Sequence, residues 1–136
     1  MEPGCVDVSG GTRRLCFALD LADQPELIER YKHWHRPGGP PAAVNRSIRA
    51  ADIDELEIWL TGSRLFMIME VGPNFDPAAK TAADAADPDV QAWEALMWEF
   101  QRPLPSAAPG EKWVPMQRIY ALSEQPTDEH TGFTIP

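Results

Sequence analysis

A tyrosine and a histidine stand four residues apart in the segment Tyr31-Lys32-His33-Trp34-His35. On an α-helix, positions i and i+4 lie on the same face, so Tyr31 and His35 would point in the same direction. An imidazole titrates near neutral pH and can give or take a proton, and aromatic rings can form the walls of a small pocket. His35 is therefore our first candidate for a proton-transferring residue. From the pattern alone, an ordinary hydrogen-bonded pair in the protein interior is the competing interpretation.

The composition limits the kinds of partner. The 136 residues include 21 Asp and Glu against 12 Lys and Arg, which gives a net charge of −9. The negative electrostatic potential of such a protein would repel nucleic acid and anionic membranes, whereas a neutral small molecule is unaffected by it. No apolar run approaches the roughly 20 residues of a membrane span. The opening MEPGCVDVSGGTRR lacks the basic start and apolar stretch of a secretory signal, so we expect a cytoplasmic protein.

The cysteines and histidines do not suggest a disulfide framework or a metal site. Cys5 and Cys16 are too few for such a framework, and Cys16 lies in an apolar run where a buried strand thiol is expected. His33 and His35 diverge on a helix, and His130 lies in a polar tail. We therefore expect neither a metal nor another cofactor.

The order of predicted elements indicates the fold. The length fits one domain over residues 12–122, with a flexible segment at 1–11 and a tail at 123–136 that is either loose or laid on a partner subunit. Residues 73–88 predict short helical turns. The other predicted elements are a strand at 13–20, helices at 25–35 and 41–51, hairpin strands at 54–60 and 64–71, a helix at 88–100, and a strand at 113–122. This order is typical of an α+β, ferredoxin-like split βαβ fold with a four-stranded antiparallel sheet. One face of such a sheet needs cover, so we expect a homodimer of the dimeric α/β-barrel type.

Two further segments contain candidate ligand-binding residues. In the first hairpin strand, Glu57 and Trp59 share a face, and an acid beside an indole could line a pocket. The competing interpretation of Glu57 is a solvated strand residue. In the helix at 88–100, Trp93 belongs to an apolar stripe, so it either touches a ligand or packs in the core.

Several separated blocks of the chain resemble the L-rhamnose mutarotases. They are the Tyr-x-x-x-His turn, the hairpin LEIWLTGSRLFMIMEV, the helix DPDVQAWEALMWEFQRPLP and the ending GEKWVPMQRIYAL. The resemblance covers about residues 13 to 122. It is closest to the branch of the family often described as L-fucose mutarotase.

The resemblance implies a cofactor-independent epimerase that interconverts the α and β pyranose anomers of a 6-deoxy-L-sugar, L-rhamnose or L-fucose. It implies that His35 is the proton donor and that Tyr31 and Trp93 bind sugar. The chain departs from the rhamnose-type pattern at Leu56, where that pattern has a tyrosine, and at Glu94, where it has a second tryptophan. These changes alter the hydrogen-bonding groups of the pocket.

Ring opening of a hemiacetal needs only general acid and base groups. The partner of His35 could be Glu57, Glu94, Tyr31 or a water molecule, and Trp59 is a further candidate wall of the pocket. Two other functions remain open from the sequence. One is a ferredoxin-like oxygenase or heme-degrading enzyme, and the other is a non-catalytic sugar-binding or assembly module on the same fold.

Overall fold

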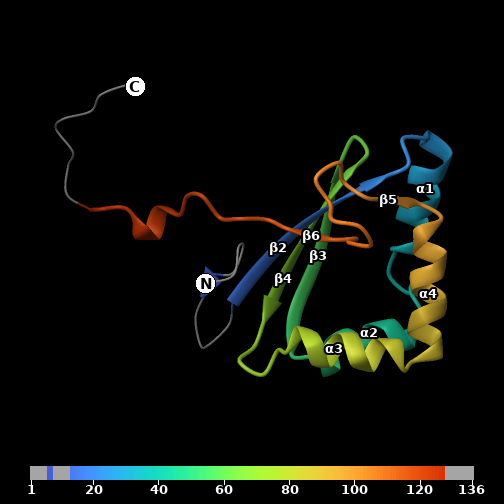
Figure 1. Cartoon of the computed structure of the whole chain (residues 1–136), viewed down its shortest axis with the longest axis horizontal. Coiled ribbons are helices and arrows are strands. Elements are labelled where there is room, and N and C mark those ends of the chain that lie inside the picture. Colours follow the sequence, from blue (N-terminus) through green and yellow to red (C-terminus); the bar gives the residue numbers. More distant parts are fainter. Residues whose placement is uncertain (1–5, 8–12, 128–136) are drawn as a thin grey trace.

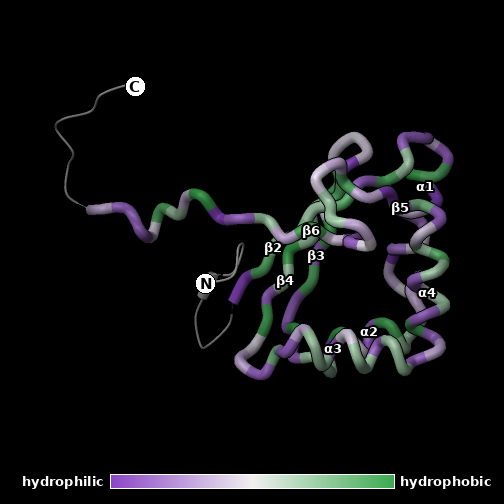
Figure 2. Tube along the Cα trace, in the orientation of Figure 1, coloured by the Kyte–Doolittle hydropathy of each residue, from purple (hydrophilic) through white to green (hydrophobic). Residues whose placement is uncertain are grey.

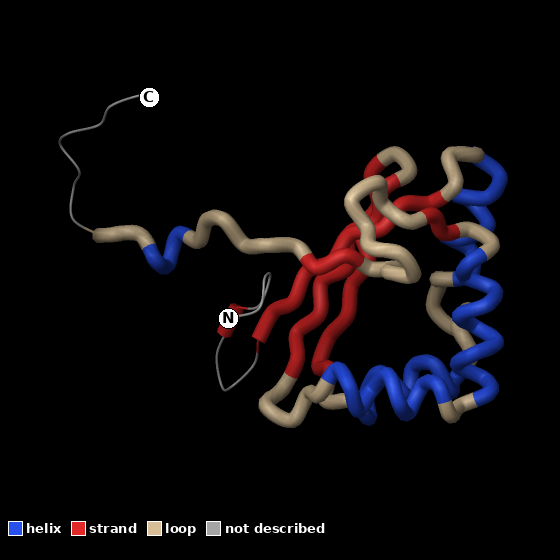
Figure 3. Tube along the Cα trace, viewed as in Figure 1, coloured by secondary structure: helices blue, strands red, loops and turns tan. Residues whose placement is uncertain are grey.

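An antiparallel sheet with helices on one side forms the body of the protein (Figures 1 and 3). The computed structural model describes residues 6–7 and 13–127. The three long strands are β2 (Arg13–Leu21), β3 (Ile53–Thr61) and β4 (Arg64–Val71), and β4 pairs with both of the others. The short strands β1 (Val6–Asp7), β5 (Gln101–Arg102) and β6 (Val114–Pro115) all pair with β2. The order β6-β2-β4-β3 confirms the predicted ferredoxin-like α+β fold.

Four helices connect these strands, namely α1 (Pro25–Trp34), α2 (Ala42–Ala50), α3 (Pro77–Ala85) and α4 (Pro88–Trp98). α1, α2 and α4 lie within one or two residues of their predicted bounds. The region of α3 was predicted to form only short turns, yet it is a regular helix. Two local features explain it: the Asp76 side chain accepts hydrogen bonds from the first backbone N–H groups, and alanine favours the helical state. Asp87 caps α4 in the same way.

The β3–β4 hairpin confirms the strongest structural prediction from the sequence. Leu60 pairs with Leu65 and Thr61 with Arg64, so the turn between the strands is short. Gly62 in this turn has a φ of 57°, a left-handed conformation that glycine adopts without steric cost. The hairpin fixes which side chains of β3 and β4 face the helices.

The predicted last strand is much shorter than expected. Only Val114 and Pro115 pair with β2, followed by one hydrogen bond from the Met116 N–H to the Cys16 carbonyl at 2.8 Å. The chain then leaves the sheet and extends away from the body, through a 3₁₀ turn at Leu122–Glu124 (Figure 1). β-forming residues predict extended backbone but not a strand partner, which explains the error. Most of the predicted flexible start at 1–11 and the end of the tail, 128–136, lie outside the described residues.

Two apolar clusters form the core. One lies beneath α1 and α4 and contains Leu21, Tyr31, Leu65, Trp93, Met97 and Phe100. The other lies between the sheet and α2 and contains Leu15, Ile53, Met69 and Val71. Tyr31 and Trp93 are thus held in place by the core itself, which restricts their rotamers.

Candidate active site

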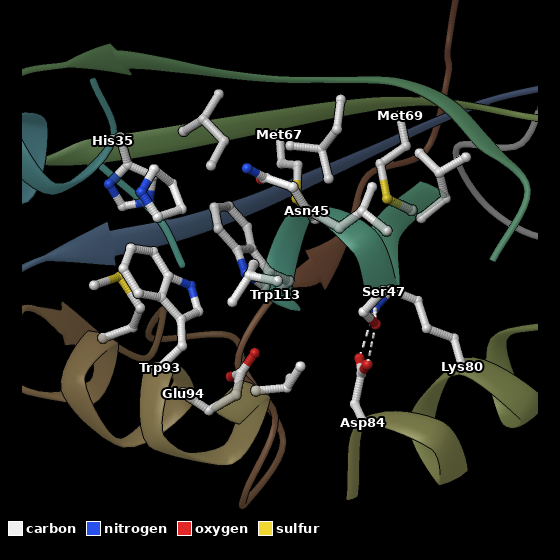
Figure 4. Close-up of a pocket in the computed structure, with 18 of the residues that line it drawn as sticks. His35, Asn45, Ser47, Met67, Met69, Lys80, Asp84, Trp93, Glu94 and Trp113 are labelled. Atoms are coloured by element: carbon white, nitrogen blue, oxygen red, sulfur yellow. Dashed lines mark hydrogen bonds and ion pairs between the residues drawn. The ribbon is translucent and has the colours of Figure 1, made fainter. Parts of the chain in front are cut away.

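A cavity of about 540 Å³ lies between the sheet and the helices. Its volume is in the range of sites that bind small molecules. Residues of the four helices, β3 and β4 form its walls, together with Gln101 of β5 and with Lys112 and Trp113 from the loop before β6. Figure 4 shows His35, Trp93 and Trp113 toward one end of it, and Ser47, Lys80 and Asp84 toward the other.

Tyr31 and His35 meet in this cavity, as their spacing predicts. α1 ends at Trp34 and His35 is its C-cap residue, so the imidazole stands at the end of the helix. The two rings lie 4.2 Å apart between centroids. His35 Nδ1 is 2.7 Å from the Tyr31 carbonyl oxygen, a contact in which the nitrogen donates. This bond selects the tautomer of the neutral ring in which Nε2 is left to accept a proton from a ligand.

The surroundings keep both groups neutral at pH 7. Burial lowers the pKa of His35, and its hydrogen bond to the Tyr31 carbonyl opposes this effect only in part. Burial also raises the pKa of the Tyr31 hydroxyl to about 12; the hydrogen bond from Gln101 lowers it and the charge of Glu94 raises it further. The neutral His35 imidazole can therefore accept a proton, and the neutral Tyr31 hydroxyl can donate a hydrogen bond.

Trp93 forms the wall beside the imidazole. Its ring meets His35 edge to face, with 5.4 Å between centroids, and meets Trp34 in the same manner at 6.1 Å. The side chain is buried and also belongs to the core beneath α1 and α4. Both predicted roles of Trp93, core packing and cavity wall, are compatible with this position. Its contact with a sugar stays a prediction.

Glu94 contributes a carboxylate to the same cavity. It forms an ion pair with Lys112, whose Nζ is 2.7 Å from Glu94 Oε2 and 4.6 Å from the centroid of the Trp98 ring. These contacts hold the loop that carries Trp113 against α4. Glu94 thus adds a charged group to a cavity wall that is otherwise aromatic at Trp93 and Trp113.

The structure places Glu57 and Trp59 away from this cavity. After an irregularity between Ile53 and Glu55, alternate residues of β3 point to opposite faces, and Leu56 and Ile58 line the cavity whereas Glu57 and Trp59 do not. Glu57 and Trp59 therefore lie on the outer face of the sheet, where the Trp59 indole N–H donates to Glu57 at 3.1 Å. We do not include them in the candidate site.

Several polar cavity residues were not identified from the sequence, among them Lys80 and Asp84 of α3. Asn45 and Ser47 come from α2, which was interpreted only as a packing helix. Ser47 donates to Asp84 and accepts from Lys80 at 3.2 Å, and Lys80 also pairs with Asp84 at 2.6 Å. Gln101, which follows α4, was missed as well. From the sequence alone, a short polar residue in a helix can face either the solvent or a cavity, and only the packing of the helix decides which.

Residues 6–7 and 13–127 contain no group of three or more His, Cys, Asp or Glu side chains that could hold a metal ion. His33 is exposed on α1. Cys16, predicted to be a buried strand thiol, is a free and partly buried cysteine in β2. Cys5 and His130 lie outside the described residues. In the same part of the chain, no helix is both long and apolar enough to cross a membrane.

We expect the His35 imidazole to titrate below its ordinary pKa of 6.5 in the folded protein, because burial disfavours the charged ring. Between the two pKa values the unfolded chain then binds more protons than the folded chain. The free energy of unfolding should consequently fall as the pH drops through 6.5 toward the pKa of the folded state.

Two measurements check this titration. NMR titration of the histidine rings gives the pKa directly, with His35→Gln assigning the resonance. Thermal unfolding at pH 7.5 and 5.5 should show a larger loss of stability in the wild type than in His35→Gln. A His35 ring that titrates above 6.5 would contradict the prediction.

Comparisons with known proteins agree on one family. A family model described as L-rhamnose mutarotase matches residues 14–122. An L-fucose mutarotase from Xanthomonas campestris is 56% identical over 112 residues, which cover 82% of this chain and 90% of that protein. A UPF0734 protein from Dictyostelium discoideum is 35% identical over 109 residues, covering 77% of this chain and 86% of that protein.

A solved structure resembles the fold as well. The crystal structure of an L-rhamnose mutarotase from Formosa agariphila superposes with a TM-score of 0.55, covering 80% of this chain and 97% of that one. The two sequences are 15% identical, so this likeness concerns the fold alone.

Proposed function

The chain belongs to the L-rhamnose mutarotase family, and we propose that it interconverts the α and β pyranose anomers of a 6-deoxy-L-hexose. L-fucose is the preferred substrate in this proposal, and L-rhamnose is the second. The preference rests on the 56% identity to a protein named L-fucose mutarotase, and the carboxylate of Glu94 in the cavity wall is consistent with it.

One observation carries the proposal: the neutral imidazole of His35 lies in a cavity of suitable size beside the Tyr31 phenol and the Trp93 ring. Mutarotation requires a group that moves a proton between two oxygens attached to the same carbon. A neutral imidazole can accept a proton and return it, which suits this task, and the orientation of the His35 ring is fixed by its bond to the Tyr31 carbonyl.

In the proposed reaction His35 transfers one proton in two stages. Its Nε2 takes the proton of the anomeric hydroxyl as the bond between C1 and the ring oxygen breaks and the C1 carbonyl forms. The resulting imidazolium then donates this proton to the ring oxygen, so His35 is the proton donor and the ring of His35 ends neutral. Rotation about the C1–C2 bond and the reverse steps give the other anomer.

The remaining cavity residues support binding of the sugar. Trp93 and Trp113 offer flat apolar surfaces to the C–H groups of a pyranose, and Met67 and Met69 offer apolar contacts to a C6 methyl group. The neutral Tyr31 hydroxyl is a donor for a sugar oxygen. Glu94 is a charge-bearing acceptor, and its carboxylate is the candidate to orient a sugar hydroxyl.

The sugar preference is tested by measuring kcat/KM for L-fucose and L-rhamnose with the same enzyme preparation. Magnetisation exchange between the anomeric proton signals gives the rates at equilibrium. We expect faster exchange with L-fucose. Equal or faster exchange with L-rhamnose would contradict the proposed preference and leave the reaction class intact.

We further propose that two chains form a homodimer. The segment after β6 extends from the body and carries Ile119, Tyr120 and Leu122, which are 90%, 63% and 76% exposed. Figure 2 shows hydrophobic positions along this segment, and Trp59 on the outer sheet face is 57% exposed. A soluble monomer seldom exposes several large apolar side chains together. We therefore propose that a second chain buries them in a dimer interface.

Sedimentation equilibrium tests the dimer. The wild type should show the mass of two chains, and the double substitution Ile119→Asp with Leu122→Asp should shift the equilibrium toward single chains, since it places charges in the buried interface. Arg118→Ala is the control, because it changes the same segment without adding a charge to its apolar residues. A wild type that sediments as one chain would exclude the dimer.

We place the protein in the cytoplasm. The free thiol of Cys16 supports this location, because thiols stay reduced in the cytosol. Cell fractionation with an antibody to the native protein tests it, and recovery in the secreted or membrane fraction would contradict it.

A further inference from the structure

Gln101 is an unusual residue within the cavity wall. It follows α4 at the start of β5, where it pairs with Leu21 of β2. It is 3% exposed and is the one buried residue with a polar or charged side chain that the described part of the chain contains. It lines the same cavity as Tyr31 and His35.

Only one end of the Gln101 amide is hydrogen-bonded. Its Nε2 donates to the Tyr31 hydroxyl at 3.2 Å. Its Oε1 is buried without a hydrogen-bond partner, the only such side-chain atom found over residues 6–7 and 13–127. An unpaired buried acceptor costs free energy, and an apolar side chain of the same length would pack among these neighbours without that cost. The glutamine is therefore poorly explained by stability alone.

We propose that Gln101 is a sugar-binding and specificity-determining residue, whose amide accepts a hydrogen bond from one hydroxyl of the substrate. The inference rests on the proposed function and names a binding group for it. The unpaired Oε1 of Gln101 is the acceptor, and the Nε2 of the same amide holds the Tyr31 hydroxyl in place.

The two side chains together match the chemistry of a sugar hydroxyl. A hydroxyl both donates and accepts. The Tyr31 oxygen accepts from Gln101, so its own proton is free to be donated to a ligand, while Gln101 Oε1 accepts the ligand's proton. Oε1 is shielded from solvent, but the last torsion of glutamine is broad, so a small turn of the amide presents Oε1 to a sugar hydroxyl while Nε2 stays near the Tyr31 oxygen. The 3.2 Å contact with Tyr31 is at the long end for a hydrogen bond and leaves room for this turn.

This arrangement predicts selectivity that an apolar wall could not provide. A site built to bond a hydroxyl rejects an analogue without it strongly, because its own polar group then stays unpaired. Ring opening involves only the anomeric and ring oxygens. Derivatives of L-fucose that lack the hydroxyl at C2, C3 or C4 can therefore still mutarotate and can report which hydroxyl Gln101 contacts.

The test compares the wild type with Gln101→Met, which keeps the length of the side chain but removes the amide. We expect kcat/KM for L-fucose to fall about ten- to a hundredfold, the size expected for one lost hydrogen bond in a buried site. The thermal midpoint should change little, because the substitution removes the unpaired oxygen but also removes the hydrogen bond to the Tyr31 hydroxyl. Gln91→Met is the matched control, because Gln91 is exposed on α4 and bonds only the Asp84 carbonyl.

The deoxy sugars separate binding from mere positioning of Tyr31. If Gln101 contacts one hydroxyl, the ratio of wild-type to Gln101→Met rates should approach one for the derivative that lacks it and stay high for the other two. An equal ratio for all sugars, or no loss with L-fucose, overturns the inference. Should Gln101→Met fail to fold, Gln101→Glu keeps an acceptor at the same reach and should retain the dependence on that hydroxyl; loss of this dependence overturns the inference.

A binding readout distinguishes this inference from the proposed function. If the wild type accelerates the anomer exchange of none of these sugars, the proposed reaction is wrong. Dissociation constants of the same sugars from NMR titration then allow the wild type and Gln101→Met to be compared by binding instead of by rate. The pattern of ratios among the deoxy derivatives still decides the role of Gln101. Absence of L-fucose binding to the wild type would overturn both.

Discussion

Replacing His35 with alanine is expected to lower the enzyme-catalysed anomer exchange by about 10²- to 10⁴-fold, the usual contribution of a positioned acid–base group. In the proposed reaction this one imidazole both removes the anomeric proton and delivers it to the ring oxygen. Tyr31 is neutral, with a pKa of about 12, and is a poor substitute as a base. The loss should appear in kcat more than in KM, because the transition state depends on the missing group.

The same variant should keep its fold. His35 caps the end of α1 and is only partly buried, so its removal costs one hydrogen bond to the Tyr31 carbonyl and the ring contacts with Tyr31 and Trp93. His33→Ala is the matched control, since His33 is exposed on the same helix and does not line the cavity. Added imidazole should restore part of the exchange by His35→Ala. A folded His35→Ala protein with wild-type exchange would place the chemistry elsewhere.

Replacing Trp93 with alanine is expected to reduce the free energy of unfolding by about 3–5 kcal/mol, the range for a large aromatic residue removed from a core. Trp93 is buried against Trp34 and His35 and belongs to the cluster beneath α1 and α4. The variant leaves a void that joins the cavity, so the imidazole loses the wall that fixes its position. Urea unfolding at pH 7.5 measures the effect.

Trp98→Ala is the control for this prediction. Trp98 lies on the same helix but is 40% exposed and contacts Lys112 from the surface, so its loss should cost about 1 kcal/mol or less. Trp93→Phe separates packing from binding, because it keeps an aromatic ring at the same place. It should recover most of the stability and only part of the activity. Equal destabilisation by Trp93→Ala and Trp98→Ala would contradict the assigned packing.

The sequence predicted the parts of the site that depend on local spacing. Tyr31 and His35 are one helical turn apart, so the helix alone brings them together. The β3–β4 hairpin follows from alternating β-formers around a turn with Gly62. Trp93 lies on a stripe with helical periodicity, which predicts a buried side chain but cannot distinguish a core residue from a cavity wall.

Other parts depend on long-range packing and could not be predicted. Alternation along β3 indicates that Glu57 and Trp59 share a face, but only the packed helices decide which face becomes the cavity. Asn45 could not be predicted for the same reason, because the sequence of α2 does not show whether this residue faces the cavity or the solvent. Gln101 was missed because it sits at the end of an apolar helix, and its unpaired oxygen is visible only once the surrounding side chains are in place.

The most direct test of the central claim is magnetisation exchange between the α and β anomeric proton signals of L-fucose, with and without the wild-type protein. The proposed function predicts that catalytic amounts of protein speed up this exchange above the buffer rate in proportion to protein concentration, and that boiled protein does not. Exchange at the buffer rate with both L-fucose and L-rhamnose, in a protein shown to be folded, would contradict the assignment of this site to mutarotation.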